Sequence, residues 1–217
     1  QIEELSTLVG DLVDLTRSEA NEVVNEPVDM SEVIERSLER VRRRRMDVEF
    51  DVEVSPWQVY GDSAGLSRAV LNLMDNAAKW SPSGEHVGVR LRQLNATHAE
   101  LVVSDHGPGI PENERELVFE RFFRSITARA VPGSGLGLAI VKQVVLKHGG
   151  ALRVEDTVPG GQPPGTSIYV LLPGRPMAVA DYPDGEDEAD VSSLSTPGNS
   201  PPPANVISVE SQTTQAR

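Results

Sequence analysis

Three short stretches of the sequence carry side chains that suit the binding of a nucleotide together with Mg²⁺. Residues 72–79 contain two asparagines and a lysine, residues 105–109 contain an aspartate followed by glycines, and residues 133–138 contain three glycines. They supply, in turn, a neutral metal ligand, a carboxylate beside an open loop, and a flexible entry to a helix. Each stretch alone is also typical of a solvated helix or an ordinary turn. Their combination in one chain favours a site for ATP and Mg²⁺.

The first stretch lies on a predicted helix over residues 62–80, with Asp62 as its N-cap. At about 100° per residue, Asn72, Asn76 and Lys79 fall on one narrow face of this helix. A different face is apolar and is expected to be buried: it carries Leu66, Val70, Leu73, Met74 and Ala77. The polar row is therefore separate from the core, and it could line a cleft.

The chemistry of these side chains indicates a role for each of them. Mg²⁺ takes few protein ligands and keeps water and phosphate oxygens, so we expect the amide oxygen of Asn76 to bind it. Lys79 lies one turn further on and can reach a phosphate as a point charge. Asp105 can only accept hydrogen bonds when ionised, which suits the exocyclic amino group of adenine. Gly107 and Gly109 would let the backbone approach the base closely.

The third stretch leads into a predicted helix, whose first N–H groups form a ready site for phosphate. It lacks the lysine of a phosphate-binding Walker loop and the glycine spacing of a dinucleotide fingerprint. Its glycines would instead let residues 110–132 close over the site as a lid. Within that lid, Arg121 and Arg124 could contact phosphates, or they could be solvated while the neighbouring phenylalanines anchor the segment.

Composition excludes several other classes of function. The chain has 217 residues, a formal net charge of −13 and no cysteine. The acidity argues against a dedicated nucleic-acid binder, and the absence of cysteine excludes disulfides and thiolate metal sites. No apolar run approaches the roughly 20 residues of a membrane span, and no signal peptide is apparent.

The hydrophobic pattern predicts two more helices and a set of strands around these stretches. The segment between 107 and 134 is expected to be a long loop with a short helix. Expected helices cover residues 30–45 and 136–148, and expected strands cover 48–54, 59–60, 87–94, 101–104, 151–155 and 166–172. The arginine run 42–45 is interpreted as a solvated helix end rather than a binding patch.

Both ends of the chain differ from this central part. Residues 1–20 carry a helical apolar stripe, which could pack in a helical bundle or on the domain itself. Residues 175–217 hold six prolines, and their seven acidic and two basic residues leave a net charge of −5. This composition predicts a disordered tail. We therefore expect a linker and helix in residues 1–25, a catalytic domain in 26–174 and the tail in 175–217.

In their order and amino-acid sequence, the motifs resemble the nucleotide-binding domain of sensor histidine kinases over about residues 1–173. Residues 72–79 are similar to the N box of that family, 105–109 to its first glycine box, 119–123 to its F box and 133–137 to its second glycine box. The amino-acid sequences of these motifs are similar to those of actinobacterial, membrane-anchored two-component kinases. Trp80 stands where the family usually has Tyr or Phe, and an indole could serve the same stacking role.

The resemblance implies a Bergerat-type α/β sandwich, an α+β fold with a mixed sheet covered by helices on one face. It implies that Asn76 binds Mg²⁺ and that Asp105 contacts adenine. It places Asn76, Lys79 and Arg121 in the catalytic machinery. It also implies nucleotide contacts from the following residues: Asn72, Asn76, Lys79, Trp80, Asp105, Gly107, Gly109, Ile110, Arg121, Arg124, Gly133, Ser134, Gly135, Leu136, Gly137 and Leu138.

The partners implied by the resemblance lie elsewhere in a two-component system. The family transfers the ATP phosphoryl group to a histidine on a dimerisation bundle, and then to an aspartate of a response regulator. No histidine precedes His86, so residues 1–20 resemble the second bundle helix without the acceptor helix. We therefore expect this chain to bind ATP without phosphorylating itself. The parent protein is expected to be a homodimer on the cytoplasmic side of the membrane.

Two other classes of protein share parts of this pattern. One is a different ATPase of the same fold, such as a gyrase- or MutL-type enzyme, a chaperone or an anti-sigma-factor kinase. The first three usually continue into a transducer domain, and the last would lack helix 1–20. The other is a binding module that holds ATP without turnover. Lys79 and the intact lid residues argue mildly against it.

Overall fold

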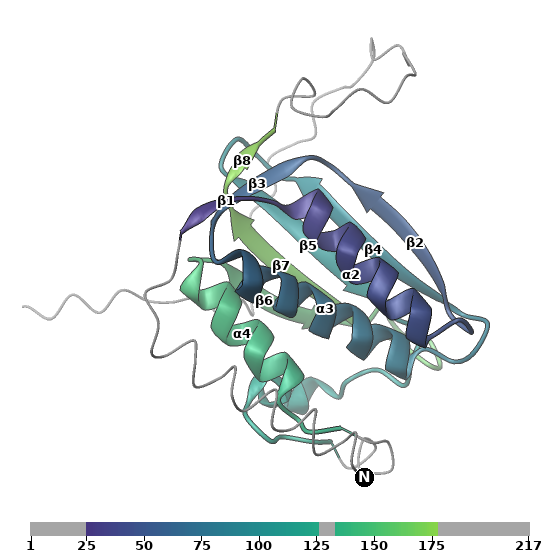
Figure 1. The fold of residues 1–217 in the computed structure, drawn as a ribbon. Helices are drawn as coiled ribbons and strands as arrows, with labels where there is room; N and C mark the ends of the chain where they lie inside the picture. The colour runs from purple at the N-terminus through teal and green to yellow at the C-terminus, as the bar shows by residue number, and fades with distance from the viewer. Residues whose placement is uncertain (1–24, 126–132, 178–217) are drawn as a thin grey trace, which may run out of the picture.

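Three helices cover one face of a five-stranded sheet in the computed structural model, which describes residues 25–125 and 133–177. Helices α2 (Met30–Arg44), α3 (Ser63–Trp80) and α4 (Gly137–Lys147) lie side by side across that face (Figure 1). This arrangement confirms the predicted α/β sandwich. The predicted helix in residues 1–20 and most of the predicted tail, residues 178–217, lie outside the described residues.

The sheet is mixed, as expected. Its strands follow the order β2 (Glu49–Val54), β4 (His86–Gln93), β5 (His98–Ser104), β7 (Ser167–Pro173) and β6 (Ala151–Glu155). Strands β2 and β4 are parallel, and all other neighbours are antiparallel. In β4, Val87, Val89 and Leu91 are buried, whereas the alternate arginines are exposed. The period-two pattern therefore directs one face of the sheet towards the core under the helices.

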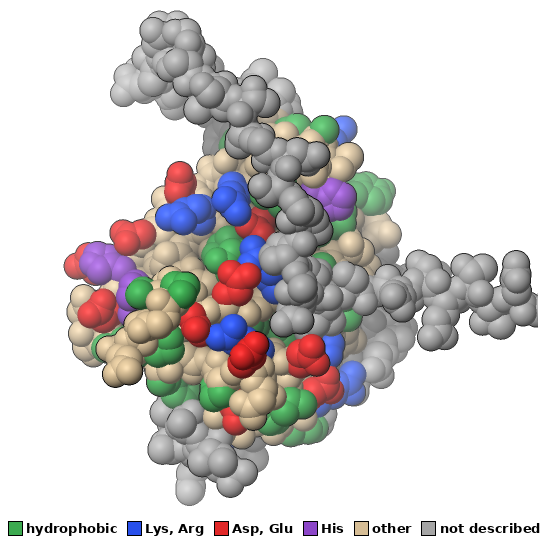
Figure 2. All heavy atoms as spheres, turned by 180° about the vertical axis from the view of Figure 1, so that it is seen from behind, with side chains coloured by type: hydrophobic (Ala, Val, Ile, Leu, Met, Phe, Trp, Pro, Cys, Tyr) green, Lys and Arg blue, Asp and Glu red, His purple; other side chains and the backbone are tan. Residues whose placement is uncertain are grey.

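The opposite face of the sheet is polar. Seen from behind, it carries interspersed basic and acidic side chains (Figure 2). Glu100 is buried there because Arg92 and Arg153 pair with its two carboxylate oxygens at 2.7 and 2.9 Å. The Arg153 guanidinium also lies 3.4 Å from the centre of the Tyr169 ring. Paired charges thus replace a second layer of helices on this face.

A second, small sheet was not predicted. It consists of β1 (Glu26–Asp29), β3 (Trp57–Gly61) and β8 (Arg175–Pro176), all antiparallel. Strand β8 thus pairs with the domain within residues 175–217, which the composition predicts to be a tail. Both missed strands are short and contain proline, so they lack an alternating pattern and are defined only by pairing with β3.

The segment before α4 contains two 3₁₀ turns instead of one short helix. They are η1 (Glu112–Glu114) and η2 (Leu117–Phe119). Phe119 is buried to 2% exposure and anchors this segment in the core. The predicted lid is described up to Ser125 and again from Gly133, and residues 126–132 lie outside the described part.

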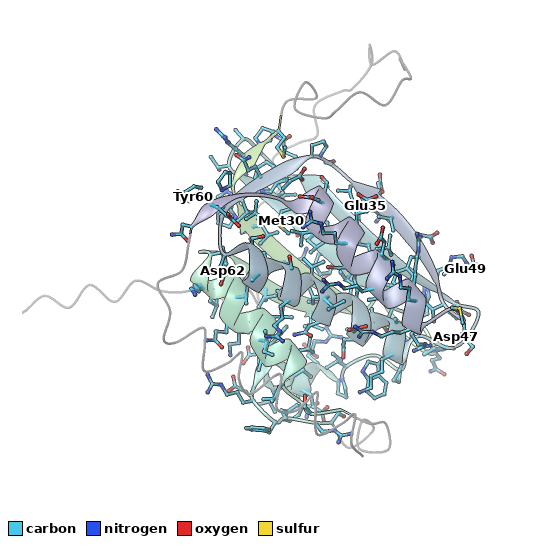
Figure 3. The ribbon with its side chains drawn as sticks, in the orientation of Figure 1. Met30, Glu35, Asp47, Glu49, Tyr60 and Asp62 are labelled. Carbon is cyan, nitrogen blue, oxygen red and sulfur yellow. The ribbon has the colours of Figure 1, made fainter. Side chains whose placement is uncertain are left out.

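The N-terminus of α3 is attached to the C-terminus of α4. The Asp62 side chain accepts a hydrogen bond from the Gly65 N–H at 2.9 Å and caps α3 as predicted, and Figure 3 shows Asp62 at the start of this helix. The Asp62 N–H itself lies 2.9 Å from Nε2 of His148. Since Nε2 accepts that bond, the ring proton is on Nδ1, which donates to the Val144 carbonyl at 2.7 Å. One neutral histidine thus links the two helices that border the site.

Part of the arginine run 42–45 is structural, contrary to the interpretation as a solvated helix end. Arg45 bonds Asp47 in the turn after α2 at 2.9 Å and donates to the carbonyl of Ala78 near the end of α3. Figure 3 shows Asp47 in this turn. The end of α2 therefore stabilises the last turn of α3, where Lys79 and Trp80 lie.

Candidate functional site

A cavity of about 340 Å³ lies where α3, the start of α4 and the loops after β5 meet. All three motif stretches contribute to its walls. The described residues that line it are Asn72, Asp75, Asn76, Lys79, Trp80, Pro108, Gly109, Ile110, Val118, Phe123, Arg124, Ser125, Gly133, Ser134, Gly135, Gly137, Leu138 and Thr166.

Helix α3 forms one wall through its predicted polar row. Asn72, Asn76, Lys79 and Trp80 are all half-buried and line the cavity, whereas the apolar face of α3 packs in the core. The Asn72 amide donates to the carbonyl of Gly137 at 3.2 Å. Asn72 therefore joins α3 to the first residue of α4 as well as facing the cavity.

Two cations, Lys79 and Arg124, line the cavity. Burial lowers the pKa of the Lys79 ammonium, and the charge of Arg124 lowers it further. The Lys79 nitrogen also lies 5.2 Å from the centre of the Trp80 ring. These two like charges on the cavity lining create a positive potential there, which suits a polyanionic ligand.

Asp105 lies behind the cavity wall at the end of β5 and is 3% exposed. One of its carboxylate oxygens accepts hydrogen bonds from the N–H groups of Gly107 and Thr166 at 2.9 and 3.0 Å. Burial raises the pKa of this carboxyl to about 6, although both hydrogen bonds act in the opposite direction. At pH 7 the group is therefore mainly ionised and able to accept further hydrogen bonds.

The loop after Asp105 is packed too closely for a side chain at Gly107. A Cβ atom there would lie 2.7 Å from the carbonyl oxygen of Trp80 and 3.0 Å from the Asp105 carboxylate. The Gly107 carbonyl in turn accepts the N–H of Gly165 at 3.1 Å. Glycine thus allows the end of α3, the carboxylate and the loop before β7 to meet at one point.

The glycine-rich stretch closes the other side of the cavity. Gly135 has a φ of 72°, and a Cβ atom there would lie 2.9 Å from the carbonyl of Phe123. Its own carbonyl accepts the N–H of Phe122 at 3.0 Å, which attaches the described part of the lid to the start of α4. The N-terminus of α4 therefore opens at the cavity, beside Lys79 and Asn72.

Four of the predicted site residues are not part of the cavity surface. Asp105, Gly107 and Leu136 are buried behind it, and Arg121 is exposed outside it. Of the two arginines predicted to contact phosphates, only Arg124 lines the cavity. The η2 turn and the irregular backbone after it explain the difference, because helical spacing does not apply to residues 120–125.

Several lining residues were not predicted as site residues. They are Asp75, Pro108, Val118, Phe123, Ser125 and Thr166. Pro108 and Phe123 lie within two motifs identified from the sequence, residues 105–109 and 119–123. Thr166 has no local signal, since only the pairing of its N–H with Asp105 brings it to the site. Asp75 lies in the first motif stretch, but no role was assigned to it from the sequence.

Within residues 25–125 and 133–177, no cluster of three or more His, Cys, Asp or Glu side chains could hold a metal ion. None of the helices in these same ranges has the length and hydropathy to cross a membrane.

Comparisons with known proteins agree with this geometry. The family model for histidine kinase-, DNA gyrase B-, and HSP90-like ATPases matches residues 61–176. The whole chain is 71% identical to the signal transduction histidine-protein kinase/phosphatase MprB of Mycobacterium avium (strain 104), and it spans only 44% of that relative.

Solved structures give the same result. A mycobacterial sensor histidine kinase MprB superposes with a TM-score of 0.68 at 72% identity, covering 71% of this chain and 100% of that one. Full-length ShkA, solved in complex with AMPPNP, superposes with a TM-score of 0.65 at 26% identity, covering 81% of this chain and 37% of that one. The chain belongs to the histidine kinase-, DNA gyrase B-, and HSP90-like ATPase family, and it contains the ATP-binding catalytic domain of an MprB-type sensor histidine kinase.

Proposed function

We propose that this domain binds ATP with Mg²⁺ and donates the γ-phosphoryl group to a histidine on a separate helical bundle of the parent protein. The observation that carries the proposal is the convergence of all three motif stretches on one cavity. The AMPPNP bound to ShkA, a structural relative, supports the choice of an adenine nucleotide.

The adenine end of the nucleotide would lie against the loop after β5. Asp105 is ionised at neutral pH and is held in place by two backbone N–H groups, so it can accept a hydrogen bond from the adenine amino group. Ile110 and Trp80 line the same cavity and offer apolar surface to the ring. Gly109 lines this side of the cavity and adds no side chain that would block the ring.

The phosphate end would lie between α3 and the start of α4. Lys79 and Arg124 supply positive charge there, and the first N–H groups of α4 open at the same place. Asn76 faces the cavity beside them and can give Mg²⁺ one neutral oxygen, the other ligands coming from phosphate and water. The bound ion would neutralise phosphate charge as the γ-group leaves. Phosphoryl transfer depends mainly on such positioning and charge stabilisation, so these groups suffice for the donor half of the reaction.

The acceptor half would be supplied by other parts of the system. We propose residues 1–25 as the end of a dimerisation hairpin, 26–174 as the catalytic domain and 175–217 as a tail. The partners would be the acceptor helix of the parent protein and a response regulator, with the parent a membrane-anchored homodimer whose kinase part faces the cytoplasm. The curated relatives are named as histidine-protein kinases, which supports this assignment.

Calorimetric titration of the chain with ATP, with and without Mg²⁺, tests the nucleotide site. We expect one site per chain, with tighter binding when Mg²⁺ is present. GTP serves as the control, because guanine has a carbonyl where adenine presents its amino group and would meet the Asp105 carboxylate unfavourably. Equal affinity for ATP and GTP would contradict the assignment of Asp105.

A further inference from the structure

One wall of the cavity contains a carboxylate that the proposed function does not use. Among the described residues that line the cavity, Asp75 is the only acidic one. It directly precedes Asn76 on α3 and is 33% exposed. A negative charge beside a polyphosphate and its metal ion would repel the first and compete for the second.

Helix α2 provides a cation for this carboxylate. Arg44, in the last turn of α2, donates to the Asp75 carboxylate at 2.9 Å. The ion pair therefore directs the Asp75 carboxylate towards α2.

The neighbouring arginine makes no such connection to the site. Arg43 pairs with Glu39 on its own helix at 3.7 Å, and its side chain is 80% exposed. Arg44 is still 59% exposed, and pairs of this kind contribute little to folding. Arg44 therefore differs from Arg43 in that its partner, Asp75, lines the cavity.

We propose that Arg44 is a positioning residue of the nucleotide site, which compensates the charge of Asp75 and keeps its carboxylate away from the phosphates and from Asn76. The proposal rests on the nucleotide site described above. It assigns to the arginine run a role in nucleotide affinity, through one residue that does not itself line the cavity.

The test is a set of four variants of the full chain, titrated with ATP and Mg²⁺ at low ionic strength. Arg44→Ala leaves Asp75 uncompensated and should weaken binding by about tenfold, the size expected for one charge near a polyphosphate. Arg43→Ala is the matched control and should bind within about twofold of the wild type, because its charge is far more screened. Asp75→Asn should bind more tightly than the wild type.

The double variant Arg44→Ala/Asp75→Asn decides between charge compensation and a merely structural role. It should bind ATP within about twofold of the wild type, because the amide needs no counter-charge. The defect of Arg44→Ala should also shrink at high salt, where the carboxylate is screened. Melting temperatures of the nucleotide-free variants give a readout independent of ATP.

The possible results separate the two proposals. If the wild type binds ATP but Arg44→Ala binds equally well, or if Asp75→Asn fails to rescue it, charge compensation is refuted and the nucleotide site stands. If Asp75→Asn alone weakens Mg²⁺–ATP binding, Asp75 is itself a ligand and the proposal is refuted. If the wild type does not bind ATP at all, the proposed function fails, and this inference fails with it.

Discussion

Replacement of Asp105 by asparagine should raise stability and abolish nucleotide recognition in the same variant. The pKa of Asp105 is raised from 3.8 to about 6 by burial. A raised carboxyl pKa in the folded state means that the ionised form is unfavourable there. The associated stability is fully present below the unfolded pKa and is lost as the pH rises through about 6.

The size of the effect follows from the same shift. About two pKa units correspond to roughly 3 kcal/mol of folding free energy above pH 7. Asparagine cannot ionise, and its side-chain oxygen can still accept the N–H groups of Gly107 and Thr166. Since these bonds to a neutral oxygen are weaker, we expect a net gain of about 1–2 kcal/mol at pH 8 and none at pH 4. For a domain of this size that is a rise of about 2–8 °C in melting temperature.

Nucleotide affinity should change in the opposite direction. The asparagine amide presents N–H donors or a weaker acceptor to the adenine amino group, so the ATP affinity should fall about a hundredfold or more. In the wild type, affinity should likewise fall as the pH drops through about 6, where the carboxyl is protonated. Thermal unfolding at pH 4 and pH 8, together with calorimetric titration at pH 8, measures both quantities.

A surface carboxylate provides the control. The Asp51 side chain is 73% exposed, so Asp51→Asn should change neither quantity appreciably. If Asp105→Asn were destabilised equally at both pH values, Asp105 would be a structural acceptor rather than a strained carboxylate. Wild-type ATP affinity in the variant would refute its role in recognition.

Three further substitutions test other contacts of the site. Asn76→Ala should reduce the affinity for ATP by about tenfold or more when Mg²⁺ is present, and barely change it when a chelator removes Mg²⁺. Paired titrations measure both affinities, and equal losses would contradict a metal-binding role. Gly107→Ala should destabilise the domain by about 1–3 kcal/mol in denaturant unfolding, because its Cβ would lie 2.7 Å from the Trp80 carbonyl oxygen. Gly88→Ala is the control and should be tolerated, because the nearest atom to its Cβ lies at 3.7 Å. His148→Ala should cost about 1–3 kcal/mol, because it leaves the Asp62 N–H without its acceptor; a neutral result would show that water replaces the ring.

Local patterns were sufficient to predict most of the fold. The 3.6-residue period and the Asp62 cap correctly located α3, and the alternating pattern of residues 87–94 located β4. The strict alternation of residues 48–54 predicts one buried face for strand β2, yet Val52 is 41% exposed. The strand lies at the edge of the sheet, where the covering helices give less protection. Edge position is a property of the tertiary structure that the local pattern does not contain.

The site was predictable where its residues lie on regular elements. Helical spacing brought Asn72, Asn76 and Lys79 to one wall, because all three share α3. Thr166 and Arg44 depend on contacts between elements that are distant in sequence. The positions of Arg121 and Arg124 differ because the backbone around them is irregular. Sequence spacing carries no directional information in such a segment.

The most direct test of the central claim is phosphoryl transfer in trans. The chain would be incubated with γ-labelled ATP, Mg²⁺ and a separate helical bundle of the parent protein that carries the acceptor histidine. We predict acid-labile, base-stable label on the bundle histidine and none on this chain, with transfer lost in Asp105→Asn. Stable label on a histidine of this chain, or no transfer to the bundle despite tight ATP binding, would contradict the account.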